Sequence, residues 1–104
     1  MQSQRLELMM DIAEKELSGL TSIHNELSST LGEKLMDTID LIEKIDGNVV
    51  LSGIGKSGMI ANKIAATLTS TGTSSFFLHS TEASHGDLGL LKENDILCFL
   101  SFLA

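Results

Sequence analysis

Three glycines punctuate the segment Gly53–Gly58 (GIGKSG), which follows an apolar run and precedes a helical pattern. Glycine lets the backbone turn tightly and approach a ligand closely. The helix that starts near Ser57 presents free N–H groups and the positive end of its dipole at the same place. Lys56 adds a positive charge, and Ser57 adds a hydroxyl donor. These residues predict an anion site, and a phosphate group is the ligand that fits it.

Several interpretations of this loop compete. A dinucleotide-binding loop has the same glycine spacing but needs an acid at the end of the next strand, where Phe77–Ser80 stands, and Glu82 is a poor substitute. A P-loop needs a glycine five positions before Gly55, where the sequence has Val50. Two interpretations of the loop remain open at this point. It either binds the phosphate group of a sugar phosphate, or it is a purely structural turn with an exposed lysine.

A second glycine-containing segment, Glu82–Gly89 (EASHGDLG), follows the next apolar run. In a parallel sheet the carboxyl ends of neighbouring strands share one edge, where ligands bind, so the two loops are expected to meet. His85 suits proton transfer near neutral pH, and Glu82 or Asp87 could orient it or accept a proton. The structural alternative is a solvated Glu82, a capping Asp87 and a partly buried His85. The segment alone leaves both open.

Ahead of these loops, apolar residues recur in steps of three and four, which predicts a long amphipathic helix. The apolar stripe of this helix must be buried against another surface, which is either the sheet of this chain or a second copy of the chain. Ser28–Thr30 interrupts the pattern, and a second helix is predicted to start at Thr30. The segment Asp46–Asn48 is predicted to end this helix. The stripe consists of Leu6, Met10, Ala13, Leu17, Leu20, His24, Leu27 and Leu31.

The remainder alternates strand and helix patterns, which predicts a parallel α/β sheet. The run Val49–Leu51 is continuously apolar and β-branched at its start, which is typical of a strand covered on both faces. The other predicted elements are a helix over Met59–Ser70, a strand over Ser75–His79, a short helix within Ser80–Gly89 and a strand over Ile96–Phe102.

Length and composition limit the function classes. A chain of 104 residues is one domain at most. Its 14 acidic and 7 basic residues give a net charge of -7, which disfavours nucleic acid as a partner. The single cysteine excludes an internal disulfide, and no apolar run approaches the roughly 20 residues that span a bilayer. We therefore expect a cytoplasmic protein without a membrane partner.

Taken together, the motifs resemble the sugar isomerase (SIS) domain of the D-arabinose 5-phosphate isomerases. The resemblance runs from about Leu31 to Ser101. It implies an α/β fold with a flavodoxin-like parallel sheet, preceded by two N-terminal helices that help bind a neighbouring subunit. It also implies interconversion of D-arabinose 5-phosphate and D-ribulose 5-phosphate, which supplies Kdo for lipopolysaccharide or capsules. The matching segments are Gly53–Gly58, Lys63–Leu68, Ser70–Thr73, Phe76–His79 and Glu82–Gly89.

The resemblance also implies roles for individual residues. Lys56 and His85 match catalytic residues, and Lys56 also lies next to the phosphate. Gly55, Ser57 and Gly58 match the phosphate loop, and Ser101 matches the first serine of a second phosphate loop. The reaction is an aldose–ketose isomerisation through an enediol, which needs no cofactor. No metal is expected, because the three histidines lack a recognisable ligand spacing.

The resemblance stops after Ser101, since Phe102–Ala104 departs from the family pattern. Later acidic residues, a later histidine, two strands and the regulatory CBS pair have no counterpart. We therefore expect a truncated form with about three strands. Residues 1–46 would form a helical segment for packing and oligomerisation, and residues 47–104 the first half of the SIS domain. The third strand would be left partly uncovered, and an isolated chain of this kind would have weak or no activity.

Two other functions remain as alternatives to the isomerase. One is a non-catalytic phosphosugar-binding or regulatory module, which needs the phosphate loop but not His85. The other is an interaction module in which the N-terminal helices are the working part. His79 closes a predicted strand and is interpreted as a cap, although its position at the edge keeps a ligand role open. Cys98 lies in an apolar run and is expected to be a buried, unreactive thiol.

Overall fold

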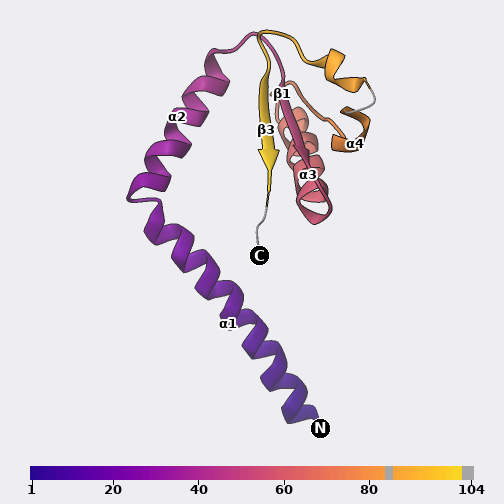
Figure 1. Cartoon of the computed structure of the whole chain (residues 1–104). Coiled ribbons are helices and arrows are strands. Elements are labelled where there is room, and N and C mark those ends of the chain that lie inside the picture. Colours follow the sequence, from indigo (N-terminus) through magenta and orange to yellow (C-terminus); the bar gives the residue numbers. More distant parts are fainter. Residues whose placement is uncertain (84–85, 102–104) are drawn as a thin grey trace. The chain divides into compact units, whose positions relative to one another are not determined.

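The computed structural model of the chain describes residues 1–83 and 86–101 (Figure 1). The chain divides into two compact units, Met1–Asp40 and Leu41–Ala104, which are described separately. This division falls inside the second helix. The predicted boundary after residue 46 concerns function and stays a prediction.

The first unit contains α1 (Gln2–Glu26) and the start of α2 (Thr30–Lys44). The break between the two helices lies at the predicted serine cluster, where the Ser28 and Ser29 hydroxyls donate to backbone carbonyls of the last turn of α1. Every residue of α1 is exposed, and Leu20 on its apolar stripe is 66% exposed. The unit thus forms the predicted amphipathic helix with its apolar stripe open to solvent.

The second unit is built on three parallel strands in the order β2-β1-β3: β1 (Val49–Gly53), β2 (Ser75–Phe77) and β3 (Ile96–Leu100). The central strand pairs Val49 with both Ser75 and Ile96. All five residues of β1 are buried, as the unbroken apolar run predicts. The parallel α/β architecture is therefore confirmed.

Helix α3 (Lys56–Ser70) follows β1 and covers one face of the sheet. Its small residues Ala61 and Ala65 are buried against Val49 and Leu51, so the helix lies close to the strand. Partly buried residues complete this core: Ile42, Ile45, Leu68, Phe77, Cys98 and Leu100. Burial raises the pKa of the Cys98 thiol, which agrees with the expected unreactive role.

Between β2 and β3 the chain forms two short helices, α4 (Ser80–Ala83) and η1 (Asp87–Leu90). β2 ends at Phe77, two residues before the predicted end at His79. Leu78 is still held, because its N–H donates to the Leu51 carbonyl at 2.8 Å and its carbonyl accepts from the Ser52 hydroxyl at 2.6 Å. The chain then turns into α4, which takes His79 out of the sheet.

β3 ends at Leu100, and the predicted continuation to Phe102 lies outside the described residues. Within the described sheet, β3 has a neighbour on one side only. Leu97 and Phe99 are about half exposed, at 48% and 53%, and they point away from the core that α3 covers. Among the described residues, no helix is long and apolar enough to cross a membrane.

One carboxylate ties the beginnings of β1 and β3 together. The Asp95 Oδ1 atom accepts the Asn48 N–H at 2.7 Å, and its Oδ2 atom accepts the Lys92 N–H at 2.8 Å. These hydrogen bonds favour the charged form and lower the pKa of Asp95 below its usual value of 3.8. The carboxylate therefore stabilises the fold above that value, and this contribution is lost as the pH falls through the folded-state pKa.

We expect Asp95→Asn to lower the thermal midpoint at pH 7, and we expect this deficit to be smaller at pH 3, which is below the usual carboxyl pKa of 3.8. Thermal unfolding followed by circular dichroism at both pH values measures the difference. Asp46→Asn removes an exposed carboxylate two residues before Asn48 and serves as the control. A deficit of the Asp95 variant that is equally large at pH 3 would contradict this role.

Candidate functional site

The loop after β1 requires glycine at its middle position. Gly55 precedes α3 with φ 61° and ψ -131°, a conformation with positive φ that L side chains rarely adopt. The space around it is open, since no neighbouring atom lies within 4 Å of a Cβ built there. The positive φ turns the chain from the strand into the helix and leaves the loop backbone accessible.

The two outer glycines bring the strand and the helix into contact. A Cβ built on Gly58 would lie 2.7 Å from the Gly53 carbonyl oxygen, and one on Gly53 would lie 2.9 Å from the Gly58 nitrogen. Both distances are shorter than real Cβ contacts, and both involve backbone atoms. Glycine at both positions therefore places the first turn of α3 directly against the carboxyl end of β1.

This contact leaves the amino end of α3 as a donor site. The Gly58 and Met59 N–H groups donate to the Ile54 and Gly55 carbonyls at 3.4 and 3.2 Å. The N–H groups before Gly58 have no preceding helical turn to bond, so they are free to bind an anion. Lys56 and Ser57 begin the helix there, and α3 carries two lysines and no acid. Helix α3 therefore carries a positive charge, although the whole chain has a net charge of -7.

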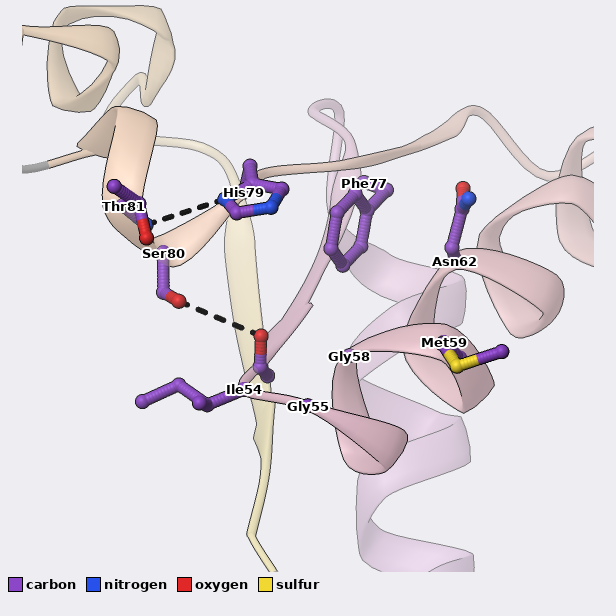
Figure 2. A pocket seen from close by; sticks show the side chains of 10 residues that line it. Ile54, Gly55, Gly58, Met59, Asn62, Phe77, His79, Ser80 and Thr81 are labelled. Atoms are coloured by element: carbon purple, nitrogen blue, oxygen red, sulfur yellow. Dashed lines mark hydrogen bonds between the residues drawn. The ribbon is translucent and has the colours of Figure 1, made fainter.

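A cavity of about 380 Å³ opens beside this loop (Figure 2). That volume lies within the range of small-molecule sites, about 300–1,000 Å³. One wall comes from the loop and α3, and the other from the end of β2 and from α4. The lining residues are Gly53, Ile54, Gly55, Gly58, Met59, Asn62, Phe77, His79, Ser80 and Thr81.

The wall on the β2 side is held by local contacts (Figure 2). The His79 ring meets Phe77 edge to face with a centroid separation of 5.9 Å. Its Nδ1 accepts the Thr81 N–H at 3.3 Å, which leaves Nε2 as the second polar atom of the ring. The Ser80 hydroxyl donates to the Gly53 carbonyl at 3.5 Å and connects α4 with the end of β1. These contacts fix the imidazole at the cavity.

The predicted site residues fall into three groups. Gly55 and Gly58 line the cavity, while Lys56 and Ser57 lie at the start of α3 next to it, and the Lys56 side chain is exposed. Ser101 is exposed and directly follows β3. Because Leu100 pairs with Gly53, Ser101 is at the same edge of the sheet as the glycine loop. His85 lies outside the described residues.

Sequence reasoning did not single out Met59, Asn62 or Thr81 as cavity residues. Asn62 lies on a predicted helix, where an exposed polar residue is usually a solvated one. The signal that would have found it is the spacing of Gly58 and Asn62 by four positions, which places both on one face of α3 beside the glycine loop. His79 also lines the cavity, so its position is compatible with the ligand role left open for it.

Comparison with known proteins gives one family. The SIS domain model matches residues 41–103. A Haemophilus influenzae protein named a probable arabinose 5-phosphate isomerase is 50% identical over 93 residues, which are 89% of this chain and 28% of that protein. The arabinose 5-phosphate isomerase GutQ of Escherichia coli K12 is 49% identical over 78 residues, which are 75% of this chain and 24% of GutQ.

A solved structure from Escherichia coli CFT073, in complex with arabinose 5-phosphate, superimposes with a TM-score of 0.76 and 41% identity. The match covers 91% of this chain and 50% of that one. The chain thus spans about a quarter of the length of the curated relatives it matches. The fold shared with this structure agrees with the predicted α/β architecture.

Proposed function

This chain belongs to the SIS domain family, and we propose that its site binds a pentose 5-phosphate and serves the interconversion of D-arabinose 5-phosphate and D-ribulose 5-phosphate. The observation that carries the proposal is the open amino end of α3 beside a cavity of about 380 Å³. The helix end supplies N–H donors for the phosphate, and the cavity has room for the sugar. The relatives named arabinose 5-phosphate isomerases support the choice of sugar.

In this proposal the phosphate binds at Gly55–Gly58. Lys56 contributes charge and Ser57 a hydroxyl donor, while Ser101 approaches from the end of β3. The reaction removes the proton from C2 of the aldose, passes through an enediol and returns a proton to C1, while O1 gains a proton and O2 loses one. His85 is proposed as the base, and Lys56 stabilises the negative charge on oxygen. The reaction is redox-neutral and requires no cofactor.

The supply of Kdo for lipopolysaccharide or capsules and a cytoplasmic location belong to the same proposal. Both follow from the proposed substrate, because phosphorylated sugars are intermediates of cytoplasmic metabolism. The net charge of -7 supports a small-molecule partner over nucleic acid.

The proposal is tested by titrating the chain with arabinose 5-phosphate and following the amide signals of residues 53–58 by NMR. We expect saturable shifts centred on this loop, and production of ribulose 5-phosphate if the chain contains the complete catalytic set. Shifts that are absent, or that lie on another face of the molecule, would overturn the proposal.

His85→Ala separates the isomerase from a regulatory phosphosugar-binding module. If His85 is the base, we expect turnover by a completed SIS domain to fall by about 10²- to 10⁴-fold, the usual contribution of a general base, with the affinity for arabinose 5-phosphate nearly unchanged. Initial rates and calorimetric titration measure the two quantities. Unchanged turnover would show that the assignment of His85 is wrong. Binding without any turnover by a complete SIS domain that carries these residues would favour the regulatory module.

We also propose that the chain self-associates through its N-terminal helices. The support is the exposed stripe of α1, on which Leu6, Leu17 and Leu20 are each more than half exposed. An apolar stripe of this length is stable in water when a second helix covers it. Light scattering on the whole chain tests the proposal, and a strictly monomeric chain at micromolar concentration would contradict it.

A further inference from the structure

Four cavity residues of α3 and its preceding loop form a single line. Gly58, Met59 and Asn62 are spaced by one and three positions and share one face of α3, while Gly55 lies in the loop directly before the helix. At a rise of 1.5 Å per residue, Asn62 lies about 9 Å along the helix axis from Lys56, where α3 begins. The cavity therefore extends from the phosphate loop along α3, and Asn62 lies at its far end.

Between the two ends the cavity wall is mostly apolar or already engaged. Met59 and Phe77 offer no strong polar group, and Phe77 lies between Asn62 and His79 in the view of Figure 2. On the other side, the His79 Nδ1 and the Ser80 hydroxyl have backbone partners within the chain, and Nε2 is the remaining polar atom of the His79 ring. Asn62 differs, because its exposed carboxamide makes no side-chain hydrogen bond to another residue in the described part of the chain.

Asparagine is also a poor choice for the helix itself. It lies well below alanine in helix propensity, because its side chain competes for backbone hydrogen bonds. Neighbouring positions of α3 carry alanine, at residues 61, 65 and 66. A carboxamide at position 62 offers both donors and an acceptor, which is the chemistry that recognises a hydroxyl group.

We propose that Asn62 is a substrate-binding residue that hydrogen-bonds the oxygen atoms at the end of the sugar remote from the phosphate. This inference rests on the proposed function, since it assumes that the phosphate binds at the amino end of α3. A ligand anchored there reaches Asn62 only if its carbon chain extends along the face of the helix. Asn62 then discriminates by chain length and favours a pentose phosphate over shorter phosphate esters.

Asn62→Ala tests this inference by isothermal titration calorimetry with inorganic phosphate, glycerol 3-phosphate and arabinose 5-phosphate. We expect the affinity for arabinose 5-phosphate to fall about five- to tenfold, the effect of one lost hydrogen bond between neutral groups. The affinity for inorganic phosphate should not change. Because alanine favours the helix, thermal unfolding should show no loss of stability. Thr67→Ala, an exposed polar residue of α3 outside the cavity lining, is the matched control and should bind all three ligands normally.

Each result has a distinct meaning. If Asn62→Ala binds arabinose 5-phosphate as tightly as the wild type, the inference is wrong and the proposed function stands. If the variant loses affinity for inorganic phosphate to the same extent, Asn62 supports the loop rather than the sugar, which also overturns the inference. If the wild-type chain binds no arabinose 5-phosphate, the proposed function fails and the inference fails with it.

Discussion

Alanine at position 58 will lower the thermal midpoint of the second unit by about 10 °C. The added Cβ would lie 2.7 Å from the Gly53 carbonyl oxygen and 3.1 Å from its carbon. Gly53 is paired with Leu100 in the centre of the sheet, so neither partner can move cheaply. Overpacking of this kind costs about 1–3 kcal/mol, and each kcal/mol corresponds to about 4–8 °C in a domain of this size.

Gly19→Ala is the control for Gly58→Ala, because both glycines lie inside helices. Helix propensity alone predicts a gain of about 1 kcal/mol for each substitution. Gly19 has nothing within 4 Å of a built Cβ, so its replacement should be neutral or stabilising. Thermal unfolding of the two variants therefore separates propensity from contact. A Gly58→Ala variant as stable as the wild type would show that α3 does not press against β1.

The second large effect is expected from Lys56→Met, which should weaken the binding of arabinose 5-phosphate by about ten- to a hundredfold. Hydrogen bonds and contacts to charged groups contribute about 1.5–3 kcal/mol, against about 1 kcal/mol for neutral pairs. Methionine keeps the length of the side chain and its helix propensity, so the charge is the main property that changes. Calorimetric titration measures the loss, which should shrink as salt screens the wild-type interaction.

Lys63→Met removes the other lysine of α3 and the same unit of charge, two helical turns further along. If only the general positive charge of the helix attracts the ligand, the two variants will bind equally poorly. If Lys56 contacts the phosphate, Lys63→Met will bind almost normally. Equal effects of the two substitutions would therefore remove Lys56 from the proposed site.

Much of the fold could be predicted because its signals are local. The unbroken apolar run at Val49–Leu51 indicated a strand buried on both faces, and all of β1 is buried. The serine cluster before Thr30 separated the first two helices, since serine hydroxyls bond nearby carbonyls and end a helix. The change of period from strand to helix after Gly53 located α3.

The features that could not be predicted depend on contacts between distant residues. β2 ends at Phe77, and the Leu78 carbonyl beyond it accepts a hydrogen bond from the Ser52 hydroxyl, a contact across 26 positions that no local pattern contains. The cavity escaped prediction for the same reason. Asn62 and His79 line the same cavity only because the folded chain brings α3 next to the end of β2. In the sequence alone, Asn62 is interpreted as a solvated residue and His79 as a capping residue.

The position of β1 in the middle of the sheet also affects how the chain folds as it is synthesised. Both hydrogen-bonding partners of this strand come later in the sequence, and its contact with Asp95 spans 47 positions. At about 5–20 residues per second, ribosomes need roughly 2–10 s to make that stretch. During this interval β2 can already pair with one edge of β1, but the edge that pairs with β3 has no hydrogen-bonding partner. The three-stranded sheet is therefore complete only after β3, its last strand in the sequence, has been synthesised.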